Sequence, residues 1–215
     1  MNKKRVGLLA FILLVTVSTS GCGYNTLQGK QQQVKNKWAN IETQLQRRAD
    51  LIPNLFEAAK AAGIQEQEVF GQIAEARSRL LNATSAQPQG EAGDKTPEQK
   101  QAVIEANNSF GGTIGRLLSL TEAYPQLRSN ENFLKFQDSL EGTESRIAVA
   151  RTDYNNVVTD YNTARGQFPM VIAAKIYGFK EEPLFTADPS ARQAPTINSE
   201  SLRRNSGGAT TNTNR

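Results

Sequence analysis

The sequence predicts an all-α fold, an elongated up-and-down four-helix bundle with long antiparallel helices. Apolar residues recur at alternating three- and four-residue steps over long stretches, which is the spacing of one helix face. Glycine or proline falls where these stretches stop, as is usual at helix ends. We assign residues 27–185 to the bundle, 1–21 to a lipoprotein-type signal peptide, 22–26 to a lipidated tether and 186–215 to a disordered tail.

The N-terminus has the parts of a secretory signal: basic residues at 3–5, an apolar stretch at 6–17, and small polar residues that lead to Cys22. The apolar stretch of about a dozen residues is shorter than the ~20 that a helix needs to cross a hydrocarbon core. The residues just before Cys22 resemble a bacterial lipobox, so Cys22 is the predicted site of acylation, palmitate included. A retained transmembrane anchor is the alternative.

These features predict a location in the bacterial cell envelope. The chain would be lipid-anchored on the outer side of the inner membrane or at the outer membrane, with the bundle facing the periplasm or the exterior. Gly23, in place of an aspartate after the cysteine, resembles the pattern of lipoproteins sorted to the outer membrane. Without the three basic residues of the signal, 22 basic residues face 21 acidic ones. Such a balance does not support binding to nucleic acid.

The first predicted helix covers residues 27–62 and ends at Gly63. Arg48 lies on its apolar stripe, and we expect a kink at Pro53. The stripe contains Leu27, Val34, Trp38, Ile41, Leu45, Ile52, Leu55, Ala59 and Ala62.

A second predicted helix covers residues 65–82, and an exposed loop follows at 83–96. The third begins with Thr96 as N-cap and Pro97 in its first turn, and it ends at Pro125. Three glycines inside the third helix should each weaken it by roughly 1 kcal/mol relative to alanine, so we expect close packing around them. They are Gly111, Gly112 and Gly115.

The fourth predicted helix has the most regular pattern and covers residues 133–168, before Pro169. Large residues recur every seven positions, and mostly small residues fill the second core position of each repeat. The first series is Phe133, Leu140, Ile147, Tyr154, Tyr161 and Phe168, and the second is Phe136, Thr143, Ala150, Val157 and Ala164.

The chain contains no histidine, which excludes a Ser-His-Asp triad and removes the commonest metal ligand. Glu141 and Glu144 have the spacing of the Glu-x-x-His motif of di-iron bundles but lack the imidazole. We therefore predict no catalytic residue, no metal and no cofactor. Arg48 needs a partner if it is buried, and Glu141 and Glu144 are the candidates.

A series of stretches, in order, resembles the LemA family. They include Trp38, Leu45-Gln46-Arg47-Arg48-Ala49-Asp50-Leu51-Ile52-Pro53-Asn54-Leu55, Leu140-Glu141-Gly142-Thr143-Glu144, Ile147-Ala148-Val149-Ala150-Arg151, Tyr154-Asn155 and Tyr161-Asn162. The resemblance covers about 24–185 and implies four long helices held outside a bacterial membrane by an N-terminal anchor. It also gives signature positions with no agreed catalytic role: Arg47, Arg48, Asp50, Pro53, Asn54, Glu141, Glu144, Arg151, Asn155 and Asn162.

We interpret the signature positions as architectural, because buried polar groups must be satisfied internally. The leading hypothesis is a membrane-tethered envelope scaffold or interaction module, not an enzyme, that binds an envelope protein of unknown identity. An accessory subunit of an envelope protease or phosphatase-like enzyme is one alternative. A ligand- or metal-binding bundle is another, and it requires Asp50, Glu141 and Glu144 to converge. The oligomeric state stays open.

Overall fold

The computed structural model describes residues 3–64, 66–85, 94–120, 124 and 129–186, and side chains from residue 23 onward within these ranges, apart from 119 and 120. The chain divides into two units, Met1–Phe185 and Thr186–Arg215. The helices belong to the first unit. The predicted tail, apart from Thr186, and most of the predicted loop lie outside the described residues.

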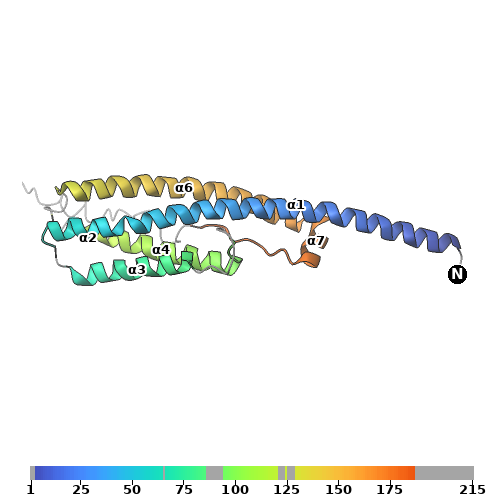
Figure 1. Ribbon diagram of the computed structural model, residues 1–215, viewed down its shortest axis with the longest axis horizontal. Helices are drawn as coiled ribbons and strands as arrows, with labels where there is room; N and C mark the ends of the chain where they lie inside the picture. Colours follow the sequence, from blue (N-terminus) through green and yellow to red (C-terminus); the bar gives the residue numbers. More distant parts are fainter. Residues whose placement is uncertain (1–2, 65, 86–93, 121–123, 125–128, 187–215) are drawn as a thin grey trace, which may run out of the picture. The chain divides into compact units, whose positions relative to one another are not determined.

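Over the described ranges the first unit is helical, without strands: α1 (Lys3–Asp50), α2 (Ile52–Ala61), α3 (Gln67–Ser85), α4 (Pro97–Leu120), α6 (Glu131–Gly166) and α7 (Met170–Tyr177). α1 and α6 lie side by side and run in opposite directions, and α3 and α4 form a second antiparallel pair (Figure 1). α2 packs on α6, and α7 packs on both α1 and α6. The predicted all-α, up-and-down bundle is confirmed.

The first predicted helix is divided close to the predicted position, Pro53, and Leu51 at the division keeps helical dihedral angles. α1 ends at Asp50, Leu51 forms a turn, and Pro53 lies in the first turn of α2. A proline has no N–H to donate to the carbonyl four residues earlier, which here is Ala49. Arg77 of α3 replaces that donor, with its Nε 2.8 Å from the Ala49 carbonyl oxygen. The break therefore leaves a carbonyl that α3 uses to attach to the end of α1.

The helix ends follow the predicted signals closely at two places. Gly63 follows α2 with φ +74°, a left-handed conformation that glycine adopts without strain. The Thr96 hydroxyl accepts from the Gln99 N–H at 3.3 Å, and the Gln99 side chain accepts from the Thr96 N–H at 2.8 Å. This reciprocal capping box starts α4 at the predicted residue.

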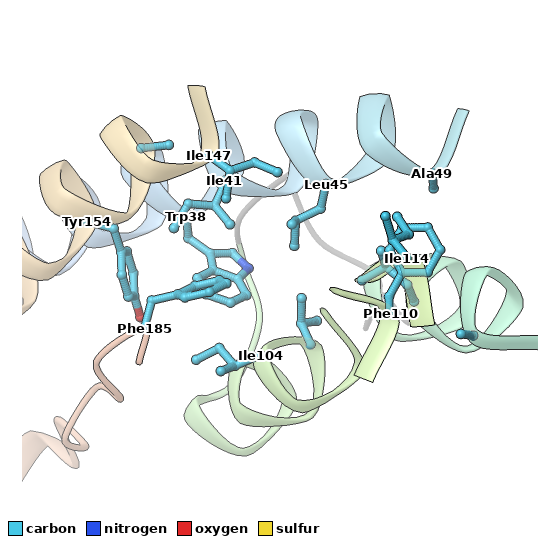
Figure 2. Close-up of a cluster of buried hydrophobic side chains, with 14 of the residues drawn as sticks. Trp38, Ile41, Leu45, Ala49, Ile104, Phe110, Ile114, Ile147, Tyr154 and Phe185 are labelled. Atoms are coloured by element: carbon cyan, nitrogen blue, oxygen red, sulfur yellow. The ribbon is translucent and has the colours of Figure 1, made fainter. Parts of the chain in front are cut away.

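Trp38 lies at the centre of the core between α1, α4 and α6. Its ring is 5.2 Å from that of Tyr154 and 6.3 Å from that of Phe185, measured between centroids (Figure 2). The stripe predicted on α1 and α2 is buried except for Ala62, which is partly buried. Each such pair of aromatic rings contributes about 0.5–1.5 kcal/mol of stability beyond what the burial of its apolar area contributes.

Two positions predicted on the stripe of the fourth helix are wrong. Phe168 is 81% exposed, because α6 ends at Gly166 and the seven-residue repeat ends with it. Val158 is buried where Val157 was expected, and Val157 is only partly buried. A straight helix has 3.6 residues per turn, so its buried face drifts relative to a strict 3.5-residue repeat over many turns.

Candidate functional site

Polar side chains gather at two places inside the bundle. The first is the Arg48 cluster, formed by Arg48, Asn107, Phe110 and Glu144. The second surrounds residues 179–185, which follow α7 in an extended conformation and which we call the strap.

The Arg48 cluster joins three helices. Arg48 on α1 is 7% exposed, and its Nη1 donates to Asn107 Oδ1 on α4 at 2.8 Å. Its Nε lies 2.6 Å from Glu144 Oε1 on α6, an ion pair whose N–H is not aligned as a hydrogen bond. The guanidinium carbon also lies 5.3 Å from the centre of the Phe110 ring. Of the two predicted partners, Glu144 is correct, whereas Glu141 is exposed.

Burial lowers the pKa of Arg48, and the charge of Glu144 opposes that shift. Arginine stays protonated in proteins in any case, so the cluster holds a permanent positive charge. A Cβ placed on Gly111 of α4 would lie 3.3 Å from Arg48 Nη2. The expected close packing is thus present at Gly111, against a side chain, but Gly112 and Gly115 have nothing within 4 Å of such an atom.

Two asparagines on α6 hold the strap through its backbone. Asn162 Nδ2 donates to the Glu182 carbonyl at 2.9 Å, and its Oδ1 accepts from the Glu182 N–H at 3.1 Å. Asn155 does the same with Phe185, at 3.1 and 2.8 Å. Each side-chain amide supplies the donor and acceptor that a residue of a neighbouring antiparallel strand would supply. The strap backbone is therefore hydrogen-bonded to asparagine side chains in the way that an edge strand is bonded to its neighbouring strand.

Two tyrosines beside the asparagines complete the backbone contacts. The Tyr154 hydroxyl donates to the Pro183 carbonyl at 2.9 Å, and the Tyr161 hydroxyl donates to the Lys180 carbonyl at 2.8 Å. Burial raises the pKa of both phenols, that of Tyr161 to about 12, and the charge of Glu182 acts in the same direction. Both hydroxyls therefore remain protonated donors at neutral pH.

Three side chains of the strap are buried in the core: Phe179, Glu182 and Phe185. Lys100 of α4 lies 2.7 Å from Glu182, and the two side chains are 0% and 5% exposed. Burial lowers the pKa of Lys100, and the attraction of Glu182 opposes it. Phe185 packs against Trp38, and the guanidinium of Arg151 lies 4.9 Å from its ring centre. The strap thus ties α4 and α6 together through one buried ion pair and one aromatic ring.

The other predicted positions lie elsewhere. Arg47, Asp50, Asn54 and Glu141 are exposed, and Pro53 lies in the turn already described. Asp50 Oδ1 accepts from Gln46 at 3.0 Å and lies 3.9 Å from Arg77. No group of three potential metal-ligating residues occurs among the described side chains, so Asp50, Glu141 and Glu144 do not converge there.

Cys22 lies within α1, and its side chain is outside the described part of the structure. Over the residues that could be searched, no helix has the length and apolar character of a membrane span.

Asn54 lines a groove of about 270 Å³ between α2 and α6, together with Glu57, Asn132 and Lys135. The groove mixes charges and amides at the surface. Activated nucleophiles need a base held within hydrogen-bond reach, and the described lining of this groove provides no such pair.

The strap is the feature that the sequence analysis missed. Its signal was present as a repeated Tyr-Asn pair, Tyr154-Asn155 and Tyr161-Asn162, seven residues apart on one helix. The spacing places both pairs on one side of α6, two helical turns apart. The seven-residue repeat predicts the two tyrosines as core residues, but it predicts no partner for the asparagines beside them.

The comparisons with known proteins agree with this architecture. The model of the LemA family matches residues 37–198, which is more than half of the chain. Magnetosome proteins MamQ 1 and MamQ 2 of Paramagnetospirillum magneticum are each 28% identical over 179 residues, covering 78% of this chain and 66% of the relative. Magnetosome protein MamQ of Magnetospirillum gryphiswaldense is 27% identical over 190 residues, covering 83% and 70%.

The chain spans just under two thirds of the length of the first two relatives. With the family model matched over most of the bundle and the strap, this chain belongs to the LemA family.

Proposed function

We propose that this protein is a membrane-tethered helical scaffold that presents an interaction surface in the cell envelope and has no catalytic activity of its own. The observation that carries the proposal is that polar signature residues of the chain make internal structural contacts. Arg48, Glu144, Asn155 and Asn162 make contacts between helices or with the strap. Side chains used in this way hold the bundle in one arrangement.

An enzyme of the usual kind aims polar groups at a position where a substrate develops charge. In this bundle the two asparagine amides are both donor and acceptor to the backbone of the strap, so they have little capacity left for a ligand. A long helical bundle with its polar side chains used internally is instead suited to binding another protein. The partner that we propose is a protein of the envelope.

The tether that we propose consists of acyl groups, palmitate among them, that are attached at Cys22 after removal of the signal peptide. Family membership supports association with a membrane, and the lipobox-like residues before Cys22 favour a lipid anchor on the outer side of that membrane. Two acyl signals are required for stable anchoring, because a single chain gives only marginal binding. Lipoprotein maturation, which acylates both the thiol and the new N-terminus, would meet that requirement.

Labelling cells with a palmitate analogue tests the tether. Cys22 is the only cysteine in the chain, so the wild-type protein should incorporate the label and the Cys22→Ser variant should not. Label retained in Cys22→Ser would contradict thiol acylation. An unlabelled wild-type chain that stays in the membrane fraction would instead indicate a retained N-terminal anchor.

Crosslinking in intact cells followed by mass spectrometry tests the interaction module. We expect the wild-type chain to give specific crosslinks to envelope proteins, and Cys22→Ser to lose them, because the untethered protein would no longer be held near its partner. Crosslinks that do not differ between the two would contradict a role for tethering. Recovery of a defined envelope enzyme would favour the accessory-subunit alternative.

A further inference from the structure

The short helix α7 has an exposed apolar face. Its members are Ile172, Ile176 and Tyr177 in the helix and Phe168 just before it, with exposed fractions of 50%, 66%, 54% and 81%. Ile172 and Ile176 are four residues apart and lie on one side of the helix, whereas Tyr177 follows Ala173 by four residues and lies at the edge nearer α1, against Tyr24. We call these four residues the α7 face.

This face is not an unfinished part of the core. The opposite side of α7 carries Ala173 and Ala174, both 4% exposed, and packs against α1 and α6. α7 therefore has one side made of small residues that fit the bundle and another made of large apolar residues that the described protein leaves uncovered. Clustered exposure of this kind marks a surface with a partner, whereas single exposed apolar residues do not.

The α7 face lies beside the point where the tether leaves the bundle. Gly23 of α1 is in contact with α7, because a Cβ at Gly23 would lie 3.5 Å from Ala173 Cβ. The ring of the next residue, Tyr24, packs against that of Tyr177 at a tilt of 58°, with 4.8 Å between the centroids. Cys22 immediately precedes Gly23 in the sequence. An anchor at or before Cys22 thus holds α7 at the membrane surface, whether it is an acyl chain or a retained N-terminal segment.

We propose that the α7 face binds the lipid bilayer surface, as a second contact beside the tether. This proposal rests on the tether proposed above. An apolar helix face of this kind lies about 5–10 Å into the boundary between headgroups and acyl chains. The two tyrosines suit the same depth, because their rings are apolar and their hydroxyls are polar. Lys175, exposed on the same helix, can extend its ammonium group to the lipid phosphates.

Quenching by brominated lipid tests this contact. The full chain with its anchor, carrying Ile176→Trp, would be reconstituted into vesicles of phosphatidylethanolamine and phosphatidylglycerol, with and without brominated acyl chains. We expect the added tryptophan to lose most of its emission in brominated vesicles. The native Trp38 is fully buried in the core and serves as the unquenched background in the parent chain.

Leu134→Trp is the matched control, because Leu134 is a 45% exposed apolar residue near the start of α6, far along that helix from α7. Its emission should not depend on the brominated lipid. Vesicle flotation, measured on the same samples, reports the tether separately. An Ile176→Trp chain that floats with the vesicles but is not quenched would overturn the α7 contact and leave the tether standing.

Two further outcomes have equally definite meanings. If the tryptophan at 176 is shielded from water but insensitive to brominated lipid, the α7 face is covered by protein and the proposal fails. A dependence of that shielding on protein concentration would identify a second copy of the chain. If Cys22→Ser abolishes flotation, whereas Ile172→Glu placed in the Ile176→Trp chain reduces quenching without reducing flotation, both the tether and the α7 contact are supported.

Discussion

The Arg48 cluster and the strap are two polar arrangements in one bundle, and they differ in what their polar groups recognise. Arg48 recognises other side chains, Asn107 on α4 and Glu144 on α6. The asparagines at 155 and 162 recognise backbone. The first arrangement fixes how three helices are aligned along one another. The second holds a segment that has no regular secondary structure of its own.

The two arrangements also differ in how water reaches their charges. Glu144 is 43% exposed, so it can be hydrated if Arg48 is lost. Lys100 and Glu182 are 0% and 5% exposed, so water has far less access to this pair. A buried ion pair is costly to break and adds little to stability when intact. Loss of one partner should therefore cost more at the strap than at Arg48.

The largest effect is expected from Lys100→Met. This change leaves the Glu182 carboxylate buried without a partner, and breaking such a pair costs about 3–5 kcal/mol. We expect that loss in the free energy of unfolding, measured by urea denaturation and followed by the emission of Trp38. Trp38 is a suitable probe because it contacts Phe185 of the strap.

The double variant Lys100→Met with Glu182→Leu sharpens the result. It removes both charges and fills their space with apolar groups, so most of the stability should return. If the double variant is as unstable as Lys100→Met alone, the cost comes from lost packing and not from the unpaired carboxylate.

Arg48→Met should have an intermediate effect. It leaves the Asn107 side-chain oxygen buried without a donor, at a cost of about 1–3 kcal/mol, while Glu144 turns to water. Thermal unfolding of the variant measures this cost. The neighbouring arginine provides the control, because Arg47 is exposed and Arg47→Met should change stability by less than about 0.5 kcal/mol. Equal effects of the two changes would rule out a special role for Arg48.

Asn155→Ala and Asn162→Ala should each loosen the strap. Each removes two hydrogen bonds to partly exposed backbone, worth about 0.5–1.5 kcal/mol apiece. Hydrogen exchange of the Glu182 and Phe185 amides should accelerate, with smaller changes in α1. Asn156 is the matched control, because it is exposed and next in sequence to Asn155. The proposed clamp is wrong if Asn156→Ala accelerates the same amides as strongly.

The smallest effects are expected at the glycines of α4. Gly112→Ala and Gly115→Ala meet open space and should stabilise the helix by up to about 1 kcal/mol each through helix propensity. Gly111→Ala should gain less or lose stability, because Arg48 Nη2 would have to move away from the new methyl group. Equal gains at Gly111 and Gly112 in thermal unfolding would show that the Arg48 side chain is free to shift.

The helices could be predicted from the sequence because the spacing of apolar residues indicates which face of a helix is buried. The need of Arg48 for a partner could also be predicted, because a charged side chain on an apolar stripe requires one. The sequence predicted the kink at Pro53 but not the bond to the Ala49 carbonyl, because the donor, Arg77, comes from another helix. The strap was also missed. Its contacts use backbone groups that every residue has, so nothing in residues 179–185 indicates what they pair with.

The free energy of unfolding of the Asn155→Ala/Asn162→Ala double variant tests most directly whether the signature residues are architectural. Four hydrogen bonds to the strap are removed, so we expect a loss of about 2–6 kcal/mol in urea denaturation, together with an early change in Trp38 emission. Wild-type stability in this variant, accompanied by loss of envelope crosslinks in cells, would contradict the account and place a binding site at these asparagines.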